Sequence, residues 1–331
     1  MLRNRMAIDF ISENDVLTLS RDGLAETGLV VADITARAVE PLVGSYAGLI
    51  VRLDGEEPHD RTPPFDPAVD PLSPGIPAYN FYSMEVVQRI GYDSFCPDNG
   101  VLLALNKDRE GRSGGPNSFN LFNWVIDANP EDIEMVDYVK PDGTPVMRTI
   151  ADYRQLNDAL FHAGLNSGSK FEYTDEPNRL HFYIIDIHRN EDNILSYTVG
   201  VRSLDDQSAR KRDFSVRAPE KFRPRSRVNE TVFILKNIDQ PVSGLSGIHP
   251  TGDMSTHLDH DIYRLSVSVR GEGWDAVILN ELVAAGTGEE VKIPVYIIRE
   301  KGADDTAEVI LTAVSESKPT LSRFATLSIS Q

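Results

Sequence analysis

Two apolar runs of different character lie near the centre of the first half of the chain. Phe81 to Ile90 mixes polar with apolar residues, whereas Val101 to Leu105 is continuously apolar. An uninterrupted apolar run is typical of a strand that is covered on both faces of its sheet. The residues between the runs are rich in Gly, Pro, Asn and Asp, which favour turns. We therefore predict two strands, Phe81 to Ile90 and Gly100 to Asn106, the second of them central in a sheet.

The segments before these runs predict a meander of strands. They are Val16 to Ser20, Leu29 to Val39 and Tyr46 to Leu53, and the last two are rich in β-branched residues. Asp15 to Ala25 also fits a helix, and both alternatives remain open. Seven prolines follow in the connector 56–77. Because proline lacks the backbone N–H that a sheet needs, we expect this connector to be a surface loop.

The remainder of residues 1–204 predicts more strands and one helix. Ile150 to Ala163 has apolar residues near helical spacing, and Gly164 follows as a natural stop. The predicted strands are Leu121 to Ile126, Ile133 to Val139, Thr144 to Arg148, Leu180 to His188 and Ile194 to Val201, the last two forming a hairpin. The fold class expected for residues 1–204 is therefore mostly β, an antiparallel β-sandwich-type domain with one helix.

The composition changes at residues 205–227, where eight Lys and Arg residues surround Pro219 and Pro224. Such a stretch is either a docking patch or a linker that rests on acidic domains, and we favour the linker. Residues 228–331 then carry short strand-like runs at regular spacing. This spacing predicts a second, smaller antiparallel β-sandwich, with the domain boundary in the basic linker.

Composition excludes several classes of protein. The 331 residues carry a formal net charge of -18, which argues against nucleic acid as a partner because a polyanion requires clustered cations. With 40% hydrophobic residues, the chain has no apolar run long enough for a transmembrane segment or a signal peptide. A single cysteine, Cys96, cannot form an intramolecular disulfide and so does not identify a redox compartment.

Two histidines have metal-like spacing. His257 and His260 lie in an acidic segment with three aspartates nearby. A catalytic zinc site of this type needs a glutamate beside the first histidine and a helix that brings both imidazoles to one face. Leu258 stands where that glutamate is required, and we expect a loop here. His257 and His260 are therefore kept only as candidates for adventitious metal binding.

Other motifs have simpler structural interpretations. Residues 111–116, Gly-Arg-Ser-Gly-Gly-Pro, resemble the nucleophile signature of trypsin-like proteases, but Arg112 replaces the aspartate and His59 lies in the proline-rich connector. We interpret them as a glycine loop. His181 and His188 are an odd number of residues apart, so we expect them on opposite faces of one strand. The acidic turns at 98–100 and 191–192 do not match a calcium-binding loop.

A family resemblance is carried by residues of the central stretch. They are Glu85, Arg89, Gly91, Asp93, Pro97 and Gly100 to Leu103. These residues resemble the late segment of secreted zinc metalloproteases of the immune inhibitor A type, and the similarity extends over residues 1–204. In that family the catalytic helix, with its His-Glu-x-x-His motif, lies upstream. The motif does not occur in this sequence.

The second domain carries a separate resemblance. Its motifs are Asn237, Asp261 to Ser266, Gly273-Trp274 and Val291 to Val295. They resemble the fibronectin-III-like modules appended to many secreted bacterial hydrolases. The resemblance implies an immunoglobulin or fibronectin-III-like sandwich for residues 228–331.

Together these resemblances imply the accessory, non-catalytic portion of a secreted zinc metalloprotease. Its expected partner is the upstream catalytic domain, which would hold zinc and bind calcium where the family does, and the strands from Val16 to Leu53 would lie against that upstream structure. A protein substrate or a cell-surface polysaccharide is a further expected partner. The alternative is a free-standing extracellular β-sandwich protein that binds carbohydrate or another cell-surface ligand. Trp124 and Trp274 would form an aromatic platform for sugar if they are exposed rather than in the core.

Overall fold

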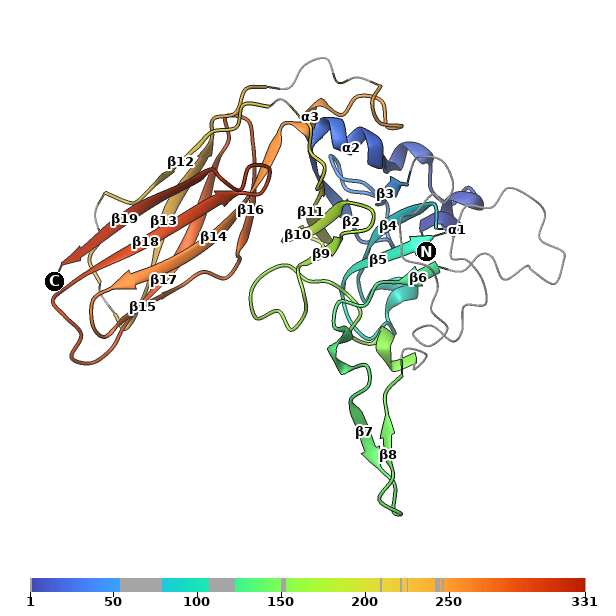
Figure 1. Ribbon diagram of the computed structural model, residues 1–331, viewed down its shortest axis with the longest axis horizontal. Helices are drawn as coiled ribbons and strands as arrows, with labels where there is room; N and C mark the ends of the chain where they lie inside the picture. Colours follow the sequence, from blue (N-terminus) through green and yellow to red (C-terminus); the bar gives the residue numbers. More distant parts are fainter. Residues whose placement is uncertain are drawn as a thin grey trace.

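The structure is a computed structural model that describes residues 2–53, 79–106, 123–149, 153–208, 210–220, 222–224, 226–241, 245 and 247–330. The proline-rich connector 56–77, with His59, and the glycine-rich residues 111–116 lie outside the described residues. The protein is mostly β, as predicted, with strands gathered into sheets that are antiparallel except for the parallel pair of the first and third strands (Figure 1). No helix in the described part of the chain is both long and apolar enough to span a membrane.

Two sheets build the first domain. The five-stranded sheet has the order β1 (Val16–Ser20), β3 (Gly48–Arg52), β4 (Phe81–Val87), β5 (Gly100–Asn106) and β6 (Asn123–Val125). The four-stranded sheet has the order β2 (Leu29–Thr35), β11 (Leu195–Ser203), β10 (Leu180–Arg189) and β9 (Glu172–Asp175). The two sheets share one core, in which Tyr82 and Met84 of the first sheet lie with Phe182 and Tyr197 of the second. Strand β5 is central between β4 and β6, which confirms its predicted place.

Two short helices accompany these sheets. Helix α1 (Leu2–Ala7) covers the outer face of the five-stranded sheet, where Leu2 packs with Ile50 and Phe81. Helix α2 (Arg21–Thr27) follows β1 directly and is capped by Ser20, whose hydroxyl accepts a hydrogen bond from the Gly23 N–H at 3.0 Å. The segment for which strand and helix were both open is therefore a strand followed by a helix.

The predicted helix at Ile150 to Ala163 is wrong. In its described part, η5 (Tyr153–Leu156) is a single 3-10 turn. Beyond it the backbone is extended, and Phe161 forms an isolated antiparallel bridge with Val101, whose two hydrogen bonds are both 2.9 Å. Of the apolar residues that gave helical spacing, Leu160 and Phe161 are buried, whereas Leu156 is exposed. Pairing between distant backbone segments has overridden local periodicity here.

A β-sandwich forms the second domain. One sheet has the order β12 (Phe214–Arg217), β13 (Val228–Asn237), β17 (Glu290–Arg299) and β15 (Trp274–Val277). The other has the order β16 (Leu282–Gly286), β14 (His260–Arg270), β18 (Thr306–Ser315) and β19 (Ser322–Ser330). Phe233 and Ile297 of the first sheet share a core with Tyr263 and Leu311 of the second. Strand β12 lies within the predicted linker 205–227 and adds to the sheet of this domain.

A narrow hairpin projects from the first domain. Strands β7 (Val136–Val139) and β8 (Pro145–Met147) pair only with each other, and Figure 1 shows the hairpin extending away from both domains. We call residues 134–148 the arm. The remaining short elements are η1 (Glu13–Asp15), η2 (Gly91–Asp93), η4 (Pro130–Asp132) and α3 (Ser255–Leu258).

Substitution of Trp274 tests whether its side chain belongs to the core of the second domain. Its side chain is 7% exposed, and its indole N–H donates to the Asp304 carbonyl at 3.0 Å. We predict that Trp274→Ala lowers the free energy of unfolding by about 3–5 kcal/mol, as other buried aromatic truncations do. Phe324→Ala on β19, where the ring is exposed, is the matched control and should change it little. Denaturant unfolding measures both, and a Trp274→Ala midpoint equal to that of the control would place the indole outside the core.

Candidate functional site

The two domains meet in an apolar contact. Leu29 and Val31 of β2 and Ile185 of β10 lie on the outer face of the four-stranded sheet and are buried against Ile262 of β14. Gly200 of β11 makes room for this contact, because a Cβ at that position would lie 2.5 Å from Ile262 Cδ1. The second domain thus covers a sheet face that would otherwise expose apolar side chains to water.

A closed ring of hydrogen bonds lies beside this apolar contact. Its members are Glu172 of β9, His181 and Tyr183 of β10, and Arg264 and Glu316 of the second domain. His181 Nε2 lies 3.0 Å from Glu172 Oε2, and its Nδ1 lies 2.9 Å from the Tyr183 hydroxyl. Tyr183 donates to Glu316 at 2.8 Å. Arg264 closes the ring by donating to Glu316 at 2.7 Å and to Glu172 at 2.6 Å.

The ring is ionic at neutral pH. Burial raises the pKa of the Glu172 carboxyl, but hydrogen bonds from His181 and Arg264 outweigh burial and lower it to about 2. Burial also disfavours the charged form of Arg264, which lowers its pKa. Hydrogen bonds to Glu172 and Glu316 outweigh burial, so the pKa of Arg264 is raised overall. The Arg264 guanidinium binds Glu172 of the first domain and Glu316 of its own domain. These charged hydrogen bonds orient the two domains relative to each other.

The connection between β13 and β14 leaves the second domain and closes an edge of the first. The N–H of Thr18 donates to Thr251 Oγ1 at 2.8 Å, and the N–H of Ser20 donates to His249 Nδ1 at 3.2 Å. Because that nitrogen accepts, His249 carries its proton on Nε2, which lies 3.1 Å from Thr27 Oγ1. The free edge of β1 is therefore covered by residues of the same chain.

His257 and His260 do not point at one common site. His257 lies in α3, with Nε2 2.9 Å from the Tyr46 hydroxyl and Nδ1 3.2 Å from the Val31 carbonyl. Because a carbonyl only accepts, Nδ1 carries the proton and Nε2 accepts from Tyr46. His260 begins β14, where its ring lies beside Gly286. Among the described residues no group of three or more His, Cys, Asp or Glu side chains is placed to hold a metal ion.

The expectation that His181 and His188 occupy opposite faces is wrong. A β-bulge interrupts β10 between Ile184 and Asp186. His181 pairs with Arg202 and His188 with Ser196, and these partners are an even number of residues apart on the regular strand β11. Both imidazoles thus lie on one face. They bind different partners, since His188 Nε2 lies 2.9 Å from Thr198 Oγ1.

The remaining predicted residues are dispersed. Trp274 is buried in the second core, and Trp124 of β6 is partly buried against the first. Asp98 lies 3.1 Å from His162 Nε2, and residues 191–192 form the exposed turn of the β10–β11 hairpin. Glu85 of β4 is buried and accepts from Arg5 at 2.8 Å, while Asp93 accepts two hydrogen bonds from Arg37.

The arm carries an exposed apolar surface. Its exposed apolar side chains are Met135, Val136, Tyr138, Val139 and Met147, each between 44% and 59% exposed. The strands are held at their base, where Glu134 N–H donates to the Arg148 carbonyl at 2.8 Å and Arg148 N–H donates to the Met135 carbonyl at 2.9 Å. Arg148 also pairs with Asp132. An isolated two-stranded hairpin is marginally stable in water, so this arm is a surface suited to burial against a partner.

Comparisons with known proteins cover nearly the whole chain. A family model described as a middle domain matches residues 7–204, and one described as a peptidase M6-like domain matches residues 215–331. A protein of Arthroderma benhamiae named "Putative secreted metallopeptidase" is 40% identical over 330 residues, which are 98% of this chain and 46% of that protein. This chain therefore spans less than half the length of that curated relative.

One solved structure shows only a distant likeness. It is that of the VesB protease of Vibrio cholerae, with a TM-score of 0.19 and 10% sequence identity over 44% of this chain and 40% of that chain. A TM-score this low carries no structural argument.

We predict that the junction loses stability below neutral pH. Burial lowers the pKa of His257 and of His260 from 6.5, although Asp33 and Asp253 near the first and Glu289 near the second oppose the shift. The unfolded chain then binds these protons more readily than the folded chain. The stabilising contribution is complete above pH 6.5 and falls as pH drops below it.

The measurement is the thermal midpoint between pH 7.5 and 5.5 for the wild type and His257→Gln, which cannot titrate. The midpoint of the wild type should fall with pH, and that of His257→Gln should fall less. His188→Gln, at an exposed position, is the matched control. Equal pH dependence in all three proteins would show that His257 does not contribute.

Proposed function

We propose that this chain is the accessory, non-catalytic portion of a secreted, immune inhibitor A-like zinc metallopeptidase, a proposal supported by the match of residues 215–331 to a peptidase M6-like domain. The coverage of the relative carries this proposal: the chain matches 46% of a protein named as a secreted metallopeptidase, and the other half has no counterpart here. The sequence contains no His-Glu-x-x-His motif. The zinc of the whole protein would then be held by the unmatched half, and this chain would serve that half by docking and substrate contact.

The domain junction supports a scaffold role. Apolar packing at Ile262 and the ring around Arg264 join residues 1–204 to residues 228–331. The division at the linker 205–227 and a fibronectin-III relationship of the second domain remain proposals. A scaffold of this kind presents its surfaces at fixed relative positions, which lowers the entropy lost when a partner binds several of them.

We propose the arm as the surface that contacts the catalytic half. The arm exposes five apolar side chains to water. Burying each of them against a partner would contribute about 1.5–3 kcal/mol to the free energy of binding. The unmatched half of the relative is long enough to supply a separate folded domain as the occupant. The arm also carries Glu134, Asp137, Lys140 and Arg148, which provide a polar rim around the apolar positions.

The alternative is a free-standing extracellular module that binds carbohydrate. An aromatic platform requires exposed rings, and Trp274 is buried while Trp124 is only partly exposed. These positions do not favour the alternative. A gene neighbour or longer reading frame that encodes a His-Glu-x-x-His helix would distinguish the two functions.

One prediction of the proposed function concerns zinc. We predict that the purified chain retains no stoichiometric zinc after dialysis and does not hydrolyse casein, because a zinc site needs three or four ligands in fixed geometry and the described residues offer no such group. Metal analysis and a casein assay, with a known zinc protease as positive control, measure this. One tightly bound zinc per chain with chelator-sensitive hydrolysis would falsify the non-catalytic assignment.

Another prediction of the proposed function concerns the arm. We predict that Val136→Asp combined with Tyr138→Ser weakens binding to the unmatched portion of the Arthroderma benhamiae relative by about tenfold or more, as expected for truncated interface anchors. Phe324→Ser, at an exposed aromatic on β19, is the matched control and should bind as the wild type does. Co-purification and titration of the separately expressed portions measure it, with the relative's own two portions as a positive control. Wild-type affinity in the arm variant would exclude the arm as the docking surface.

A further inference from the structure

The sequence contains one acceptor motif for an N-linked glycan. Asn229, Glu230 and Thr231 form Asn-x-Thr, in which the middle residue is not proline. No other asparagine in the sequence is followed two positions later by serine or threonine. Asn229 is the second residue of β13, which begins at Val228. A glycan is retained only where the folded chain has room for it, so the surroundings of Asn229 decide whether the motif is usable.

The backbone around Asn229 lies at the surface of the second domain. Strand β12 pairs only with Ile234 to Asn237, so among the strands that the structure describes β17 alone pairs with β13 at Asn229. Val228 and Glu230 on either side are exposed, and Asn229 itself is half-buried. The start of β13 is therefore an exposed strand end rather than part of the sandwich core.

The Asn229 amide faces the turn before the strand. Its Nδ2 donates to the Ser226 carbonyl at 2.7 Å, and its Oδ1 accepts from the Ser226 N–H at 3.1 Å. Both hydrogen bonds are exposed. An N-glycosidic bond replaces one of the two hydrogens on Nδ2 and leaves Oδ1 unchanged. The remaining N–H and Oδ1 can still bind Ser226, so the turn is compatible with a sugar on this side chain.

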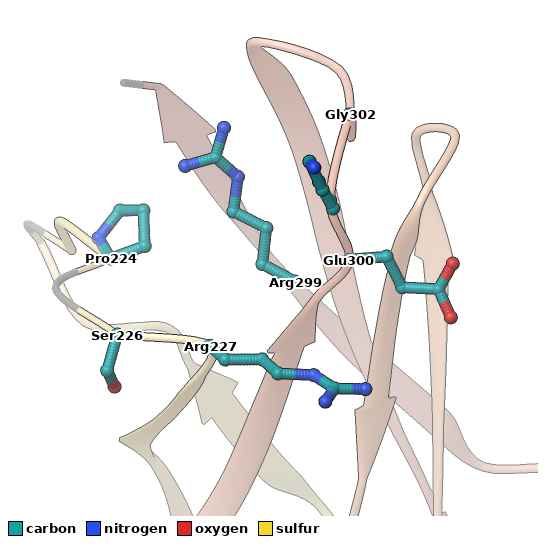
Figure 2. A pocket seen from close by; sticks show the side chains of 7 residues that line it. Pro224, Ser226, Arg227, Arg299, Glu300 and Gly302 are labelled. Atoms are coloured by element: carbon teal, nitrogen blue, oxygen red, sulfur yellow. The ribbon is translucent and has the colours of Figure 1, made fainter.

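An open hollow lies beside the same turn. Its volume is about 470 Å³, and Ser226 and Arg227 line it together with Arg299 and Gly302 (Figure 2). In Figure 2 the guanidinium groups of Arg227 and Arg299 point in different directions, so they do not enclose one small ligand. The hollow instead leaves space at the surface next to Ser226, the residue that the Asn229 amide contacts. The first sugar of a glycan has room there.

The site is remote from the contact between the domains. At the other end of β13, Asn237 Nδ2 donates to the carbonyl of Ala285 in β16 at 2.8 Å. Strand β16 also supplies Leu282 to the apolar contact with the first domain. The length of β13 therefore separates Asn229 from the junction, and a glycan on Asn229 leaves the junction unobstructed.

We propose that Asn229 carries an N-linked glycan, an inference that rests on the secretion included in the proposed function. The donor is an oligosaccharide joined to a lipid through a diphosphate. A bond forms between Asn229 Nδ2 and the anomeric carbon of the first sugar, and the bond from that carbon to the diphosphate oxygen breaks. The lipid diphosphate leaves, and the Nδ2 proton passes to a base of the transferring enzyme. Transfer takes place before the chain folds, so the burial of Thr231, which is 7% exposed, does not prevent it.

The experiment expresses the full chain behind a secretion signal in a eukaryotic host and measures its intact mass before and after treatment with peptide-N-glycosidase. We expect a mass excess of one oligosaccharide on most chains, which treatment removes while converting Asn229 to aspartate. Asn229→Gln and Thr231→Val should abolish the excess, whereas Thr231→Ser, which retains a hydroxyl, should keep it. Asn4→Gln, at an exposed asparagine outside the motif, is the matched control and should carry the glycan as the wild type does.

The medium and the microsomal fraction are both assayed, so that a chain which enters the secretory pathway without being released is also measured. Wild-type chain without a mass excess in both fractions would overturn the proposal, as would a glycan that persists in Asn229→Gln. The zinc and arm experiments can be run on chain made in a bacterial cytosol, where no such glycan is added. Failure of the proposed function is therefore distinguishable from failure of this site.

Discussion

The apolar contact between the second domain and the outer face of the four-stranded sheet is the interaction on which the architecture depends. A sheet that carries Leu29, Val31 and Ile185 on its outer face cannot leave that face in water without a large free-energy cost. Ile262 and Leu282 cover it. Burial of each such side chain contributes about 1.5–3 kcal/mol, whereas a partly exposed ion pair contributes about 0–1 kcal/mol. Apolar burial therefore supplies the affinity between the domains, and the ring around Arg264 supplies their orientation.

The same logic explains why the connection between β13 and β14 covers part of the first domain. The connection before β14 sends Met254 and Leu258 into the core of the first domain, and His249 and Thr251 to the edge of β1. A sheet with an open edge offers unpaired N–H and C=O groups to other chains. The second domain and the connection before β14 therefore cover both a face and an edge of the first domain that would otherwise be exposed.

The strands could be predicted from the sequence because each depends on local patterns. Gly100 to Asn106 is an apolar run that fits a central strand whatever its neighbours are, and it forms β5. The helix predicted at Ile150 to Ala163 failed because Phe161 pairs with Val101, a contact that periodicity cannot show. The face of His188 was wrong because a bulge adds one residue to β10 without a sequence signal.

The junction could not be predicted for a related reason. The Arg264–Glu172 pair joins residues 92 positions apart, and the Thr18–Thr251 hydrogen bond joins residues 233 positions apart. Nothing in the spacing of His249 or Thr251 indicates that they close the edge of β1.

The basic stretch shows how one composition serves two purposes. At its start, Arg212 is buried and donates to Asp239 at 2.6 Å and to the His260 carbonyl at 2.9 Å. Removing one partner of such a buried pair costs about 3–5 kcal/mol, because the other charge is left without compensation. This arginine is therefore an internal anchor where the chain enters the second domain. At the end of the stretch Arg227 is exposed. The buried charge holds the fold through its partner, whereas the exposed charge faces water.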